Sequence, residues 1–209
     1  MSAKIDAGML ELLSSKICHD LISPIGAVNN GLELFNELGP SAGPEATELI
    51  AYSAAQASAK LQAFRMAYGA GGANSHLKAE DVLKTIGQLI RADKKISQQW
   101  DPYADLGAPQ SKPGFYKILT CVLLLGIEAL PKGGSLSVMG DGDSTTVTAR
   151  GPGAALRTHA RDALEMKIKT DDLEPHDVHA AMTALMATHY NFSVTVGKTA
   201  DDMTEFVIR

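Results

Sequence analysis

The chain has 209 residues, of which 45% are hydrophobic and 21% are charged, an ordinary composition for a protein that buries a hydrophobic core. Its formal net charge of −5, with basic residues scattered along the chain, gives no electrostatic reason to expect nucleic acid or a membrane as a partner. Two distant cysteines, Cys18 and Cys121, do not make a disulfide framework, and residues 1–17 show no secretory signal, so we expect a cytoplasmic protein.

Residues 9–38 predict one long amphipathic helix. At about 100° per residue, nine mainly apolar residues project onto a single stripe that runs its whole length. These residues are Leu10, Leu13, Ile17, Leu21, Pro24, Ile25, Val28, Leu32 and Phe35. Asp6 is placed to cap the start of this helix. The Gly- and Pro-rich segment 39–44 cannot continue the helix and predicts a hairpin loop.

A second helix is predicted at residues 45–68, and the glycine-rich run 69–74 after it has the character of a linker. We therefore expect a helical hairpin domain at 1–70 and a second domain at 74–209. A lone hairpin leaves part of each apolar face in water, and pairing with a second copy would complete a four-helix bundle. A homodimer is expected on this ground. The alternative is that the C-terminal half of the same chain covers the stripe.

Beyond the linker, helices and strands alternate. Helices are predicted at 80–93, 113–130, 154–166 and 175–188, and strands at 95–100, 136–139, 144–149, 192–196 and 205–208. The turn Asp141-Gly142-Asp143 joins two of these strands as a hairpin. The predicted fold class is α+β, a helical hairpin followed by an α/β layer.

His19 lies about opposite the apolar stripe and is therefore expected to face water in the middle of a long helix. Pro24, five residues later, removes a backbone hydrogen bond at a cost of about 3 kcal/mol unless something compensates. A neutral imidazole offers a nucleophilic nitrogen that can hold a phosphoryl group as a phosphoramidate. Asp20 can bind the other ring nitrogen or handle its proton. We interpret His19 and Asp20 as catalytic, against the alternative of a spectator histidine on a solvated face.

The helix face around His19 predicts where a protein partner docks. Its residues are Leu12, Ser15, Lys16, Ile22, Ser23, Gly26 and Asn30. Leu12 and Ile22 are expected to be exposed apolar residues on either side of the nucleophile. Gly26, a poor helix former, would let a partner backbone approach closely. No thiolate or carboxylate cluster predicts a metal site, and His176 and His179 are assigned to a surface helix.

The segment His19-Asp20-Leu21-Ile22-Ser23-Pro24 resembles the phosphoacceptor motif of histidine kinases: a His, an acid, Leu, any residue, Ser or Thr, and Pro. The second domain resembles their ATP-binding domain in the segments LLLGIEALPKGGSLSV, TARGPGAAL and HYNFSVTVGKTADDMTEFVIR. Yet Cys121, Leu125 and Ala149 stand where that family has polar nucleotide contacts. No glycine-rich phosphate loop appears between Leu164 and Val178.

A complete phosphoacceptor helix on a kinase scaffold with an emptied nucleotide pocket resembles the ChpT class of alphaproteobacterial histidine phosphotransferases. The resemblance implies a dimeric four-helix bundle followed by a degenerate histidine-kinase ATPase-like α/β sandwich. It implies that His19 accepts phosphate from the receiver domain of a hybrid histidine kinase. The resemblance further implies that His19 passes the phosphate to receivers of response regulators that control the cell cycle, CtrA and CpdR.

The same resemblance implies a phosphotransferase without ATP kinase activity. No cofactor is expected in this chain, and magnesium is expected in the partner receiver domain. Two alternatives remain open from the residues alone. One is an ATP-using histidine kinase, and the other is a non-catalytic module that docks on receivers and never carries phosphate.

Overall fold

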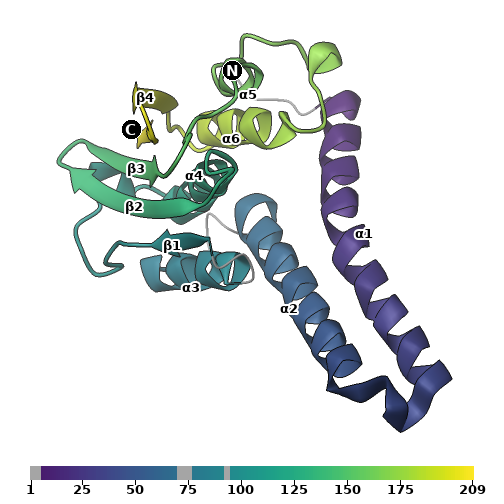
Figure 1. Cartoon of the computed structure of the whole chain (residues 1–209). Coiled ribbons are helices and arrows are strands. Elements are labelled where there is room, and N and C mark those ends of the chain that lie inside the picture. Colours follow the sequence, from purple (N-terminus) through teal and green to yellow (C-terminus); the bar gives the residue numbers. More distant parts are fainter. Residues whose placement is uncertain (1–5, 70–76, 92–94) are drawn as a thin grey trace.

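A computed structural model describes residues 6–69, 77–91 and 95–209. The chain begins with a hairpin of two long helices, α1 (Ala7–Leu38) and α2 (Gly43–Tyr68), joined by a 3-10 turn at Gly39–Ala42 (Figure 1). Asp6 caps α1 as expected, because its Oδ1 accepts a hydrogen bond of 2.8 Å from the Met9 backbone N–H. The hairpin prediction is confirmed. The predicted domain boundary and most of the linker lie outside the described residues.

The rest of the chain forms one mixed sheet with helices. Its elements are α3 (Ala79–Ile90), β1 (Ile96–Gln98), α4 (Phe115–Glu128), β2 (Gly134–Asp141), β3 (Ser144–Arg150), α5 (Thr158–Leu164), α6 (Val178–His189), β4 (Val194–Ala200) and β5 (Met203–Ile208), with 3-10 turns at Ala108–Ser111 and Thr170–Asp172. The strand order is β1-β2-β3-β5-β4, in which only β1 and β2 are parallel. The α+β prediction is confirmed.

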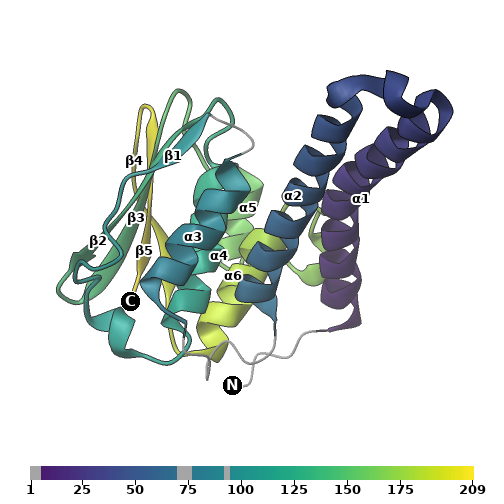
Figure 2. The same cartoon turned by 90° about the horizontal axis from the view of Figure 1, so that it is seen from below.

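The molecule is arranged as a sheet, a middle layer of helices and the hairpin beyond them (Figure 2). Alternate residues of the central strands, such as Leu136, Val147 and Phe206, are buried on the helix-covered face. Helix α4 lies in the middle layer and is buried from Phe115 to Gly126 except at Tyr116. Because α4 contacts elements on both sides, its sequence is apolar all round. None of the helices within the described ranges is long and apolar enough to cross a membrane.

Helix α5 is shorter than the prediction of 154–166. The segment before it is held by bonds to other parts of the chain. The Ala155 N–H donates to the Ala129 carbonyl at 3.0 Å, and the Gly153 N–H donates to Asp202 Oδ1 at 2.6 Å. These donors are engaged with partners distant in sequence, so the helix starts only at Thr158.

The C-terminal end of α2 is anchored in the second domain, while the loop end of the hairpin projects away from it (Figure 1). Ala63 and Ala67 are fully buried, and their small side chains let α2 approach α4 closely. The Cys121 thiol on α4 lies 3.7 Å from the Ala67 carbonyl. The buried Lys117 ammonium donates to the Gly69 carbonyl just past the end of α2. Burial lowers the pKa of Lys117.

A buried histidine joins α2, α4 and α6. His179 Nε2 lies 2.9 Å from the Cys121 carbonyl, which can only accept, so Nε2 carries the proton. Nδ1 then accepts from the Tyr68 hydroxyl at the end of α2. His179 is only 4% exposed, so its assignment to a surface helix was wrong. The reason is that α6 packs against α4, α5 and α1 together, so its first half is buried on every side.

Burial lowers the pKa of His179 below its ordinary value. In acid the unfolded chain therefore binds a proton that the folded chain excludes, and the free energy of unfolding falls as the pH drops below about 6.5. The loss cannot exceed about 1.4 kcal/mol per pH unit for one group. We expect His179→Gln, which keeps a donor and an acceptor but does not titrate, to show a shallower fall of Tm between pH 7.5 and 5.5 than the wild type.

The pH dependence from His159 has the opposite sign, because the hydrogen bond that its Nδ1–H donates to Asp177 raises its pKa. The contribution of His159 is present in both the wild type and His179→Gln, so it cancels when their Tm profiles are compared. Parallel Tm profiles for the variant and the wild type would contradict the role given to His179.

Candidate functional site

His19 lies in the middle of α1 and its side chain is 87% exposed, which confirms the predicted exposure. Its Nδ1 is 3.5 Å from Oδ1 of Asp20, whose side chain is only 20% exposed. Among the described residues, none forms a hydrogen bond with Nε2. A side chain with one nitrogen beside a carboxylate and the other open to solvent is suited to receive a group from another protein.

Asp20 is held by two lysines from two helices. Lys16, one turn earlier on α1, places its ammonium 3.1 Å from Oδ2 and 3.3 Å from Oδ1 of Asp20. Lys60, on α2, donates a 2.9 Å hydrogen bond to the backbone carbonyl of Asp20. The carboxylate next to His19 is therefore fixed by its surroundings, while the imidazole itself is not.

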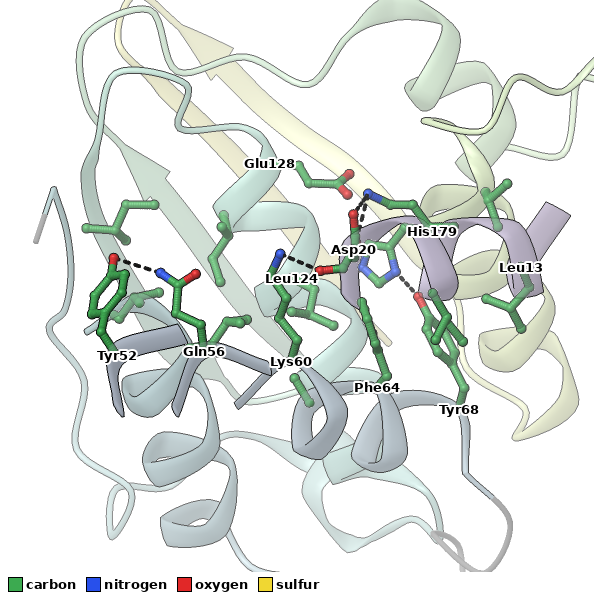
Figure 3. A pocket seen from close by; sticks show the side chains of 18 residues that line it. Leu13, Asp20, Tyr52, Gln56, Lys60, Phe64, Tyr68, Leu124, Glu128 and His179 are labelled. Atoms are coloured by element: carbon green, nitrogen blue, oxygen red, sulfur yellow. Dashed lines mark hydrogen bonds and ion pairs between the residues drawn. The ribbon is translucent and has the colours of Figure 1, made fainter. Parts of the chain in front are cut away.

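These groups border a cavity of about 500 Å³ between the hairpin and the second domain (Figure 3). Its polar lining includes Asp20, Lys60 and Glu128, and Figure 3 shows the Asp20 and Lys60 side chains extending into it from different helices. Leu13 and Ile17 also line it. The predicted apolar stripe is thus divided, because Leu13 and Ile17 face the second domain of the same chain.

Four other residues of the stripe are exposed in the single chain. Leu10, Ile25, Leu32 and Phe35 are between 45% and 59% exposed. Pro24, which belongs to the same stripe, is buried. The second domain therefore does not cover the stripe as the alternative supposed, except near Leu13 and Ile17.

Most of the predicted docking face is open. Ile22 is 68% exposed, and Ser15, Ser23 and Asn30 are also exposed. A Cβ added at Gly26 would meet no atom within 4 Å.

The exceptions on that face are Leu12 and Lys16. The expected exposure of Leu12 was wrong, because its side chain is partly buried against the hydrophobic core. Helix α1 contacts α6 and the turn at Thr170–Asp172 near its start, and these contacts draw that side of the helix out of solvent. Lys16 is also partly withdrawn, with its side chain 26% exposed.

The positions that correspond to nucleotide contacts are inside the core. Cys121, Leu125 and Ala149 are all completely buried. Burial raises the pKa of the Cys121 thiol to about 12, so it stays protonated and is a poor metal ligand. Sequence reasoning identified the substitutions but not the burial, which for Cys121 includes contact with the end of α2 at Ala67.

One group of potential metal ligands occurs among the described residues. Donor atoms of Glu174, His176 and Asp177 lie within 4.8 Å of one another. Ion pairs account for these side chains. His176 Nε2 lies 2.8 Å from Glu174, and His159 Nδ1 lies 2.5 Å from Oδ2 of the buried Asp177. The cluster is a charge network before α6, distant in sequence from His19, and the expectation of no metal stays a prediction.

Comparison with known proteins places this arrangement in a family. Residues 79–202 match the family model of the histidine phosphotransferase C-terminal domain. The curated protein phosphotransferase ChpT of Brucella abortus (strain 2308) is 36% identical over 202 residues, which cover 92% of this chain and 91% of the relative. A solved structure described as that of a bacterial phosphotransferase matches with a TM-score of 0.80 and 31% identity, and all of both chains is covered.

The match over most of the chain, together with an exposed histidine on a helical hairpin, defines the class. The chain belongs to the histidine phosphotransferase family. It is a protein phosphotransferase of the ChpT type that acts in a phosphorelay.

Proposed function

We propose that His19 is the residue that carries the phosphoryl group and that its partners are receiver domains. One observation supports this most directly. His19 is the histidine of the phosphoacceptor-like segment, and its side chain is 87% exposed beside a fixed carboxylate. A group that must be reached in turn by a donor and by an acceptor protein has to project from the surface. The donor is a receiver domain of a hybrid histidine kinase, and the acceptors are receivers of response regulators such as CtrA and CpdR.

In the proposed transfer the Nε2 lone pair attacks the phosphorus of a receiver aspartyl phosphate. An N–P bond forms as the P–O bond to the aspartyl group breaks, and the receiver carboxylate leaves with the electron pair. For Nε2 to have a free lone pair, the proton must be on Nδ1, and the Asp20 carboxylate 3.5 Å away favours that tautomer. The Nδ1 proton is then shared with Asp20 or released to water.

Delivery to the second receiver is the same reaction in reverse. Lys16 and Lys60 hold Asp20 in place during both steps, since one binds its carboxylate and the other its carbonyl. The magnesium that shields the phosphoryl charge would come with the receiver. No metal or other cofactor is proposed for this chain.

We further propose that the protein does not use ATP and works in the cytoplasm. The three positions expected to contact nucleotide are buried among core residues, and one of them, Cys121, is covered by the α2 backbone at Ala67. Binding a nucleotide there would require the end of α2 to move off α4. This argues against the alternative of an ATP-using histidine kinase.

Two labelled phosphate sources test the proposed carrier. We expect label to appear on the chain after incubation with a radiolabelled phospho-receiver domain, and none after incubation with radiolabelled ATP and Mg²⁺. The label should be acid-labile and base-stable, and His19→Ala should abolish it with little change in Tm, since exposed substitutions shift stability by less than about 0.5 kcal/mol. Label from ATP would indicate a kinase, and a bound receiver with no label would indicate a docking module.

The docking face predicts a second result. In Gly26→Leu the new side chain meets no atom of its own chain, and the helix gains propensity, so the fold should be retained. The same side chain would occupy the space that a receiver needs beside Ile22. We expect transfer from every receiver to fall by at least about tenfold, as expected when reacting groups are misplaced. Gly26→Ala is the matched control, because it removes the glycine but adds little bulk, and it should transfer normally.

A homodimer through the hairpin is proposed from the uncovered part of the stripe. The exposed apolar side chains of this stripe, Ile25, Leu32 and Phe35, are costly in water unless another surface covers them. A second copy that packs hairpin against hairpin would form a four-helix bundle and leave His19 outside it.

We expect Ile25→Asp to be monomeric by light scattering at micromolar concentration, while the wild type is a dimer. Ile25 is a better position for this test than Ile17, because Ile17 lines the cavity within the chain. Leu34→Asp is the matched control, since Leu34 is similarly exposed but projects to about the opposite side of α1. A wild-type monomer, or an Ile25→Asp dimer, would contradict the proposal.

A further inference from the structure

We infer that Lys60 is a positioning residue for phosphotransfer, and that it supplies the hydrogen-bond donor that Pro24 removes from the helix of His19. The inference rests on the proposed role of His19. It concerns a bond between two helices that follows from the chemistry of proline and is not apparent from either helix alone.

The Asp20 carbonyl lacks its helical hydrogen-bond donor. In an α-helix the N–H of each residue donates to the carbonyl four residues earlier, so the carbonyl of Asp20 would receive its bond from residue 24. Residue 24 is proline, which has no N–H, and its ring crowds the same carbonyl and displaces it. Nevertheless α1 continues through Pro24 to Leu38. Some other group therefore has to satisfy the Asp20 carbonyl.

Lys60 provides that group. Its Nζ lies 2.9 Å from the Asp20 carbonyl oxygen, a normal distance for a charged donor, and the two residues are 40 positions apart in sequence. The Lys60 side chain is partly buried and comes from α2, on the cavity side of the hairpin (Figure 3). It extends beside Phe64 and Gln56 of its own helix, which also line the cavity.

The bond fixes the part of α1 that matters for transfer. Asp20 directly follows His19, so a tether on its carbonyl limits rotation and displacement of the turn that carries the imidazole. Lys16 at the same time holds the Asp20 carboxylate at 3.1 Å. Without Lys60, the carbonyl would rely on water, and the turn before Pro24 would be free to shift. In-line transfer between two proteins requires reacting atoms held to a fraction of an ångström, and a misplacement of about 1 Å can slow a reaction roughly 100-fold.

This explanation makes the effect of Lys60 depend on Pro24. Lys60→Met keeps the length and apolar stem of the side chain but removes its donor. In the natural Pro24 background we expect it to slow transfer from a phospho-receiver by about ten- to one-hundredfold. In a Pro24→Ala background the backbone N–H regained at position 24 restores the ordinary helical bond, so Lys60→Met should change the rate by less than about twofold. Each comparison is made within one background, so an effect of Pro24→Ala itself does not enter.

Two control variants separate positioning from charge and from folding. Lys60→Arg keeps a charged donor and should retain most of the rate. Lys84→Met removes the same charge from a position on α3, outside the hairpin, and should transfer normally. Circular dichroism and dimer mass should be the same for all these variants and the wild type.

A spectroscopic measurement tests the bond without any transfer. The carbonyl ¹³C resonance of Asp20 should move upfield in Lys60→Met, because a carbonyl that loses a donor is less polarised. It should return towards its original position in the Pro24→Ala, Lys60→Met double variant. An unmoved resonance would overturn the inference even if the transfer rate changed.

The outcomes distinguish this inference from the proposed function. If the wild type takes no label on His19, the proposed carrier is wrong, and the resonance still reports whether the bond exists. If the wild type is labelled and Lys60→Met transfers at the same rate, Lys60 has no positioning role. An equal loss in the natural and Pro24→Ala backgrounds would also overturn the inference, because the effect of Lys60 would not arise from the missing donor.

Discussion

Backbone carbonyls that lose their helical donor place a strict demand on the surrounding structure, because each one needs another partner if it is shielded from water. The Asp20 carbonyl before Pro24 is one of these, and Lys60 on α2 donates to it. A second lysine, Lys117 on α4, donates to the carbonyl of Gly69, just past the end of α2. The first bond links α2 to α1, and the second links the end of α2 to α4 in the middle layer of the second domain. A continuous chain of contacts therefore leads from the turn that carries His19 to the core of the protein.

The hairpin packs on the second domain through the C-terminal end of α2. Helix α4 is buried both against the sheet and against the end of α2, which is possible because Ala63 and Ala67 leave room for close contact. The same contact covers Cys121, so a scaffold that resembles a nucleotide-binding domain has a helix of its own at one of the positions where polar contacts are expected. His179 adds to this contact between α2 and α4, because its ring bonds to both the Tyr68 hydroxyl and the Cys121 carbonyl.

The sequence predicted the hairpin and the strands well, because helical and alternating periodicity are properties of each segment alone. It also placed His19 correctly, since an angle on a helical wheel gives exposure when only one side of the helix is covered. Leu12 and His179 were misplaced because their surroundings depend on elements far away in the sequence. A wheel shows which residues share a face, but not which element packs against that face. Pro24 signalled a missing hydrogen bond from the sequence, whereas the donor, Lys60, could be identified only once α2 lay beside α1.

Consecutive residues of a helix point about 100° apart, and the site uses this separation. His19 projects into solvent, where the proposed donor and acceptor proteins would reach it in turn, while Asp20 lies towards the cavity, where Lys16 and Lys60 hold it. A carrier between two proteins needs both properties at neighbouring positions. If the imidazole were held as firmly as the carboxylate, the proposed receiver partners could not approach it. If the imidazole and the Asp20 carboxylate were both free, the ring would have no preferred tautomer or orientation. Pro24 does not weaken this arrangement, because the Asp20 carbonyl that it leaves without a helical donor accepts a hydrogen bond from Lys60 on α2.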